Sequence, residues 1–214
     1  MVNHVRRCKL TDTILDATLD AYKEYLKICD YTMGFFDTPE YWYTTAITRQ
    51  IAKTHTSRNI YPVLEDSVES VRKHSGSSPG RLPDSLRRTG RTDIALWKYG
   101  RSDWIPLSFI EVKRGRKWNA RFKDDIGRII ASLDRSGIKS GSGTLEEGFF
   151  VVVSDYWGKS KAEIYEKFES DFDAIWDKIA DTLDDARVFN GYWEHSKYYK
   201  DEKTMGAVMV FKIK

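Results

Sequence analysis

The chain has 214 residues, of which 41% are hydrophobic, 14% aromatic and 31% charged. This length and composition predict a single folded domain over residues 1–214 and exclude a disordered chain. No stretch approaches the roughly 18 uncharged apolar residues of a membrane helix, and the first residues lack the apolar centre of a signal peptide. We therefore expect a cytoplasmic protein with no membrane partner.

Charge is distributed unevenly along the chain, although the formal net charge is only +3. Twelve Lys or Arg residues face four acids between Arg81 and Lys123, whereas ten acids face four lysines between Asp155 and Asp185. A basic segment favours a polyanionic partner such as nucleic acid. The two cysteines fit neither a disulfide framework nor a zinc site, and the four histidines have no metal-ligand spacing.

The first quarter of the chain predicts two helices. Apolar residues at helical spacing indicate one helix from about Thr11 to Cys29. The sequence TPEYWYTTAITRQIAK begins a second, with Thr38 as N-cap and Pro39 as the first helical residue. Glu40 then lies in the first turn, on the same face as apolar residues that look toward the core. This acid either complements the helix dipole or belongs to a functional site.

Two strands follow a short helix and a loop. The helix covers residues 63–74, and Gly, Ser, Pro and Arg dominate the loop over residues 75–90. The strands run from about Thr92 to Lys98 and from about Trp104 to Arg114. Only five residues separate them, which is few enough for an antiparallel hairpin.

The rest of the chain predicts two helices, a buried strand and a terminal hairpin. A helix from about Trp118 to Arg135 has apolar residues along one side, and a polar loop follows it. The run GFFVVVSDYW at residues 148–157 is typical of a strand covered on both faces at the centre of a sheet. A helix from about Lys161 to Ala186 and a hairpin over residues 191–214 complete an α/β (α+β) fold, in which helices flank a central mixed sheet.

Three polar side chains converge where the two hairpin strands meet. Glu111 and Lys113 share one face of their strand because side chains alternate, and Asp93 heads the neighbouring strand within reach of them. Two carboxylates that approach each other are unfavourable unless a cation joins them. Mg²⁺ or Mn²⁺ prefers hard oxygen ligands, so we expect one such ion on Asp93, Glu111 and the Val112 carbonyl. A cation there can activate water against a phosphodiester, with Lys113 holding the water or the scissile phosphate.

The triplet of an acid, any residue and lysine is weak evidence as a string, since about three occur by chance in a chain of this composition. Its setting carries more weight. Glu111 ends an apolar strand 18 residues after Asp93, and the basic run RGRKWNAR follows directly. The alternative interpretation is a structural salt bridge between strand residues.

From Glu40 to about Asp155, the chain resembles the PD-(D/E)XK nuclease superfamily. The shared order is a helix with an acid, a strand headed by an acid, a strand ending in Glu-Val-Lys, a basic helix and a buried strand. The resemblance implies a restriction-endonuclease-like core over about residues 38–155, with the N-terminal helix, the C-terminal helix and the hairpin as additions. It also implies roles for four residues: metal ligation by Asp93 and Glu111, a catalytic lysine at Lys113 and an auxiliary acid at Glu40.

The chain departs from the family pattern in two places. Thr92 stands where the family name has proline, and the first of three expected strands lies either within Arg81–Arg88 or around Tyr61. The helix after the lysine carries Asp125 and Arg128, which fit either a place near the site or a surface ion pair.

The residues around the acids suit a phosphate backbone, and the predicted contacts are Arg91, Arg114, Arg116, Lys117 and Arg121. Trp97 and Trp118 could stack on bases, although core packing is the favoured role of both. The leading hypothesis is a Mg²⁺-dependent nuclease acting on DNA, by analogy in restriction, defence or repair. The alternative is an inactive nucleic-acid-binding or protein-interaction module on the same fold. A homodimer through the helix at residues 161–186 is a further hypothesis.

Overall fold

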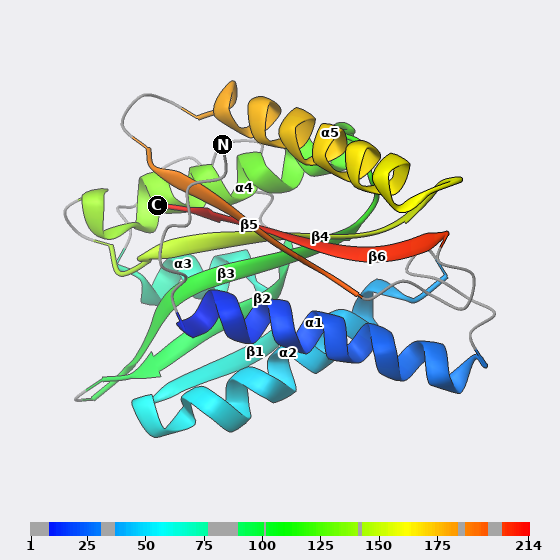
Figure 1. Cartoon of the computed structure of the whole chain (residues 1–214). Coiled ribbons are helices and arrows are strands. Elements are labelled where there is room, and N and C mark those ends of the chain that lie inside the picture. Colours follow the sequence, from blue (N-terminus) through cyan, green and yellow to red (C-terminus); the bar gives the residue numbers. More distant parts are fainter. Residues whose placement is uncertain are drawn as a thin grey trace.

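A six-stranded mixed sheet with helices on both faces forms the protein (Figure 1). The computed structural model describes residues 9–30, 37–76, 90–100, 102–140, 143–183, 187–196 and 203–214. The strands lie in the order β1-β2-β3-β4-β6-β5. Their bounds are Ile60–Ser67 for β1, Arg91–Tyr99 for β2, Trp104–Arg114 for β3, Glu147–Trp157 for β4, Phe189–His195 for β5 and Thr204–Ile213 for β6. This arrangement is the predicted mixed α/β fold.

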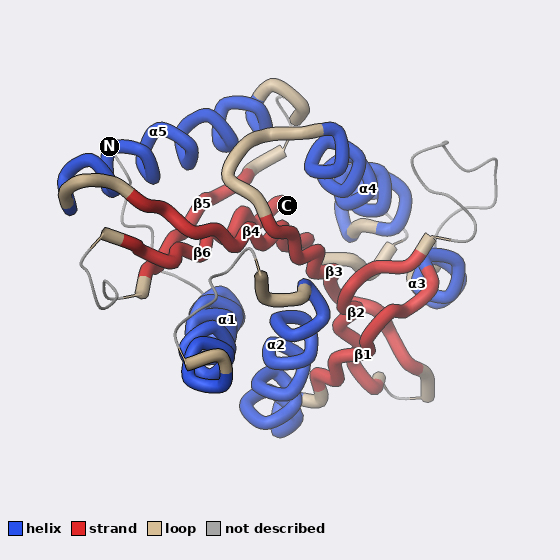
Figure 2. The backbone as a smooth tube through the Cα atoms, turned by 90° about the vertical axis from the view of Figure 1, so that its right-hand side faces the viewer, coloured by secondary structure: helices blue, strands red, loops and turns tan. Residues whose placement is uncertain are grey.

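Five α-helices and two 3₁₀ turns cover the sheet in the described part of the chain. They are α1 (Lys9–Ile28), α2 (Glu40–His55), η1 (Thr56–Arg58), α3 (Val68–His74), α4 (Ala120–Ser136), η2 (Ile138–Ser140) and α5 (Lys161–Ala180). Helices α1 and α2 pack on one face, and α3, α4 and α5 pack on the other (Figure 2). Each face has its own apolar core, because buried side chains of the central strands alternate between them. None of the described helices is long and apolar enough to cross a membrane.

The parallel pair β3 and β4 positions the candidate site. All other strand pairs in the sheet are antiparallel, and α4 is the crossover that joins β3 to β4. Both strands have their carboxyl ends on the same side of the sheet. The loops that follow them therefore place the first turns of α4 and α5 on that side. Open α/β sheets bind ligands outside the carboxyl ends of such strands.

Strand β3 sends its polar and apolar residues to different layers. Ile110 and Val112 are fully buried in the core under α1 and α2, whereas Phe109 belongs to the core under α4 and α5. Glu111 and Lys113 alternate with Val112 and therefore face the α4 side with Phe109. Strand β4 is covered on both faces, as its continuous apolar run predicts.

The region before the hairpin corrects one prediction and decides between the two places expected for the first strand. The helix predicted over residues 63–74 begins only at Val68, and the residues before it belong to edge strand β1. Pairing with β2 overrides the local helical pattern there, and Pro62 is compatible with an edge strand. The first expected strand thus lies around Tyr61. The alternative at Arg81–Arg88 falls outside the described residues.

The start of α2 differs by one residue from the predicted one. Pro39 is the N-cap, with φ −60° and ψ 142°, and Glu40 is the first helical residue. Thr38 is buried rather than capping, and its carbonyl oxygen accepts a hydrogen bond from Arg114 Nη1 at 3.1 Å. Glu40 still lies in the first turn, which is the part of the prediction on which the site depends.

The C-terminal elements follow the prediction with one addition. Strands β5 and β6 form the expected antiparallel hairpin, but β6 lies between β4 and β5 inside the sheet. Helix α5 ends at Ala180, and residues 184–186 of the predicted helix are outside the described residues. Its aromatic stripe, including Phe168 and Phe172, packs on the sheet of its own chain.

Two glycines give a matched test of how closely α4 packs on the sheet. A Cβ atom at Gly148 of β4 would overlap the Ile129 side chain, whereas no heavy atom lies within 4 Å of a Cβ at Gly127 in α4. We expect Gly148→Ala to lower the free energy of unfolding by about 1–3 kcal/mol through overpacking. Gly127→Ala should raise it by about 1 kcal/mol through helix propensity. Urea denaturation of both variants measures this, and equal effects would contradict the close packing.

Candidate active site

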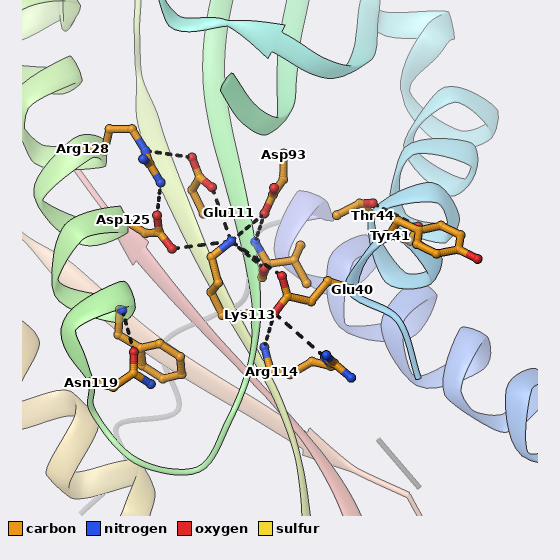
Figure 3. Close-up of polar contacts among 12 residues, drawn as sticks. Glu40, Tyr41, Thr44, Asp93, Glu111, Lys113, Arg114, Asn119, Asp125 and Arg128 are labelled. Carbon is orange, nitrogen blue, oxygen red and sulfur yellow. Dashed lines mark hydrogen bonds and ion pairs between the residues drawn. The ribbon is translucent and has the colours of Figure 1, made fainter. Parts of the chain in front are cut away.

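Asp93, Glu111 and Lys113 lie together at the ends of β2 and β3 (Figure 3). The antiparallel pairing of these strands holds Ile94 opposite Ile110. Beyond that pair the Asp93 carboxylate accepts a hydrogen bond from Val112 N at 2.7 Å and another from Lys113 Nζ at 3.3 Å. The predicted convergence of the three side chains is therefore present.

Lys113 is the centre of the cluster. Its ammonium nitrogen lies 3.5 Å from Asp125 Oδ2, 3.9 Å from Glu111 Oε2 and 4.0 Å from Glu40 Oε2, in addition to Asp93. It also donates to the Val112 carbonyl oxygen at 3.1 Å. Only 14% of the lysine side chain is exposed. Four carboxylates from two strands and two helices thus share one largely buried cation.

A closed ring of ion pairs joins β3 to α4. Glu111 contacts Lys113 through Oε2 and Arg128 Nε through Oε1, the latter at 3.5 Å. Asp125 contacts Lys113 through Oδ2 and Arg128 Nη2 through Oδ1. Each acid therefore bridges both bases, and the two positive and two negative charges balance. Asp93 and Glu40 are additional carboxylates outside this ring.

The position of Asp125 and Arg128 resolves the two interpretations of this pair. Asp125 is only 5% exposed, so the pair is not a surface ion pair. The sequence contains a signal for this, because Asp125 lies three residues after Phe122 and four before Ile129 and so shares their buried helical face. Thr92, next to Asp93, is buried, and its side chain is one of the groups that lower the pKa of Glu111.

The pKa of Glu111 is raised to about 7, chiefly by burial and then by the negative charge of Asp93. The neighbouring Arg128 and Lys113 oppose this rise. A buried carboxyl with a raised pKa gains more from a nearby cation than an exposed one, because water does not already stabilise its charge. The ionisation of Glu111 therefore depends on the charges that the site holds.

Glu40 reaches the cluster from the other face of the sheet. The first turn of α2 lies at the edge where β3 ends, and Glu40 Oε1 accepts a hydrogen bond from Arg114 N at 3.3 Å. Its side chain is 39% exposed, the most open of the four acids. The acid predicted to be auxiliary is thus in contact with the lysine, at the rim of the site.

The five predicted phosphate contacts occupy different places. Arg114 and Arg121 line a pocket beside the acids, and Lys117 is exposed in the loop after β3. Arg116 stacks on the ring of Trp157 at 4.4 Å, and Arg91 lies 3.7 Å from Glu65 on the edge strand.

Trp97 and Trp118 pack in the core, in agreement with the favoured interpretation. Trp97 is 6% exposed and donates from Nε1 to Asp66 at 2.7 Å. Trp118 packs against the core with its ring edge-on to Phe122. Trp97 is therefore not available for stacking on a base, and Trp118 is partly buried.

The oxygen atoms around Lys113 suit a divalent cation of the magnesium type. Asp93, Glu111 and the Val112 carbonyl all approach one point, which the ammonium group marks. Mg²⁺ typically binds through one or two carboxylates and keeps several waters, so Asp93 and Glu111 are the acids that could hold one. In the described part of the chain, no group of three or more His, Cys, Asp or Glu residues is arranged to hold a metal ion. The fit therefore depends on two acids and one backbone oxygen.

Comparisons with protein-family models, with curated proteins and with solved structures gave no match. The interpretation of the site accordingly depends on its own geometry and chemistry.

The shared lysine gives a test that does not involve catalysis. In Lys113→Met the buried carboxylates lose their common cation, so we expect the free energy of unfolding in chelator to fall by about 3 kcal/mol. Added Mn²⁺ should recover part of this loss, because it binds only the folded state. The increase in Tm with Mn²⁺ should be larger in Lys113→Met than in the wild-type protein, and smaller in Asp93→Asn.

Lys178→Met is the matched control, since Lys178 is exposed on α5 and forms a 3.3 Å ion pair with Asp181. It should behave as the wild-type protein in both conditions. Equal responses of Lys113→Met and Lys178→Met to Mn²⁺ would contradict a cation site at the acids.

Proposed function

We propose that the protein is a divalent-cation-dependent nuclease that hydrolyses phosphodiester bonds, with DNA as the expected substrate. The observation that carries the proposal is the convergence of Asp93, Glu111 and Lys113 at the carboxyl end of a parallel strand pair. Asp93 and Glu40 add two carboxylates to the charge-balanced ring, and this additional negative charge supports a site that attracts a cation. The resemblance to the PD-(D/E)XK superfamily assigns the same three residues.

Each residue of the cluster has a role in this proposal. Asp93, Glu111 and the Val112 carbonyl hold Mg²⁺ or Mn²⁺, which when bound polarises the phosphoryl oxygen and lowers the pKa of water. Lys113 orients the attacking water or the scissile phosphate and stabilises the negative charge that grows on it.

The remaining polar residues support these groups. Arg128 and Asp125 fix Glu111 and Lys113 through the ion-pair ring. Glu40, at the open rim, can accept the proton that leaves the attacking water. This role agrees with its greater exposure among the four acids.

One observation favours a different function. The ion-pair ring is balanced without any added cation, which is also what a purely structural network requires. The second candidate is therefore an inactive nucleic-acid-binding or protein-interaction module in which the four charges join α4 to the sheet. The two functions predict opposite results in a cleavage assay.

The proposal predicts cleavage that requires both the metal and the acids. Linear, circular and single-stranded DNA and RNA are incubated with the protein in Mg²⁺ or Mn²⁺ and then in chelator. We expect products only with metal, and a loss of about 100-fold or more in rate for Asp93→Asn, Glu111→Gln and Lys113→Met. Gel electrophoresis of labelled substrates measures the rates and also separates cutting within a strand from cutting at an end.

Glu24→Gln is the control for an acid outside the site, because Glu24 lies exposed on α1, with Arg49 3.9 Å away. It should cleave at the wild-type rate. Binding of nucleic acid without any metal-dependent product would overturn the nuclease in favour of the inactive module.

The cytoplasm is the compartment in which we expect the enzyme to act, in restriction, defence or repair by analogy. Homodimerisation is a separate proposal that sedimentation at several concentrations would test.

A further inference from the structure

A pocket of about 300 Å³ lies beside the acid cluster and shares Lys113 and Glu40 with it. Its other lining residues come from the end of β3 and the first turn of α4. Figure 3 shows Asn119 at the start of α4 on one side and Arg114 at the end of β3 on the other, with the connecting loop between them. The polar residues of the lining are Glu40, Lys113, Arg114, Asn119 and Arg121.

Cations outnumber acids in this lining, and the other three carboxylates of the cluster lie next to it. Lys113, Arg114 and Arg121 are cationic, and Glu40 is the one acid that lines the pocket. Glu40 is already engaged, since Arg114 N donates to it and Lys113 Nζ lies 4.0 Å away. Lys113 is shared with the acid cluster and Arg114 Nε lies 3.9 Å from Glu40 Oε1, so the exposed Arg121 is the lining cation that offers an entering group the most positive charge.

The backbone of α4 adds hydrogen-bond donors to the same space. Asn119 caps the helix by accepting from Phe122 N at 3.1 Å, so that N–H group is satisfied. The N–H groups of Ala120 and Arg121 precede it in the first turn, where an α-helix provides no internal partner. Both residues line the pocket. Directed N–H groups beside cationic side chains form the donor set that phosphate oxygens accept.

We propose that this pocket binds a phosphate group of the nucleic-acid strand next to the phosphate that is cleaved. The inference rests on the proposed nuclease function and assigns one contact of its substrate. The small volume suits a phosphate with its sugar, since ligand pockets begin at about 300 Å³. Because Lys113 belongs to both the pocket and the acid cluster, a phosphate bound here places the neighbouring phosphodiester at the acids.

Phosphate binding is measured without catalysis, on the full chain in chelator. Inorganic phosphate is titrated while the backbone amide resonances of Ala120 and Arg121 are followed by NMR. We expect both resonances to shift and saturate, and Arg121→Gln to weaken the binding by about fivefold through the loss of a charged donor. Arg49→Gln, whose arginine is 75% exposed on α2, should bind phosphate within about twofold of the wild type.

Trinucleotides then identify the source of the phosphate. Tighter binding of the 5′-phosphorylated form than of the 5′-hydroxyl form assigns the pocket to a strand end, and equal binding assigns it to an internal diester. Either result supports the proposal when the Ala120 and Arg121 amides respond. Resonances that do not move, or an Arg121→Gln variant that binds as the wild type does, would overturn it. Since no metal or cleavage is involved, failure of nuclease activity leaves this result unaffected, and the reverse also holds.

Discussion

One largely buried ammonium group shared by four carboxylates is the interaction on which the candidate site depends. Lys113 is the point at which β2, β3, α2 and α4 meet through Asp93, Glu111, Glu40 and Asp125. Like charges at such short range in a low dielectric would repel one another strongly without it. The cation therefore holds together elements that the chain places far apart in sequence, and it does so at the edge of the sheet where ligands can enter.

The proposed cation and the proposed phosphate would meet different sides of this arrangement. Burial and the nearby Asp93 raise the pKa of Glu111 to about 7, so a cation close to this acid favours its ionised form. On the other side of the lysine, the pocket before α4 is lined by Arg114 and Arg121. The acids proposed to bind a metal ion and the bases proposed to bind phosphate thus lie next to each other. Phosphodiester hydrolysis requires both kinds of residue, because the metal ion and the negatively charged phosphate backbone must be bound at the same time.

Much of this geometry could be predicted from the sequence, because it follows from local rules. Strand alternation places Glu111 and Lys113 on one face, and a five-residue connection lays β2 against β3 so that Asp93 approaches them. The helix start at TPE places Glu40 in a first turn. Each of these inferences needs only neighbouring residues or one short loop.

The features that escaped prediction depend on packing between distant segments. Residues 63–67 read as helix by their local pattern, yet pairing with β2 makes them a strand. Arg128 completes the ring only because α4 packs on the sheet next to Glu111. The close approach of Ile129 to Gly148 fixes this position of α4. The helical spacing of Asp125 signals burial, but no single-sequence rule identifies Lys113 as its partner.

The most direct test of the central claim is a crystal structure of the wild-type protein soaked in Mn²⁺, with data collected at the manganese absorption edge. The account predicts an anomalous peak bonded to Asp93 and Glu111, with the Lys113 ammonium displaced from the point between them. A structure without a peak at these carboxylates, in which Lys113 keeps all four of its acidic partners, would contradict it.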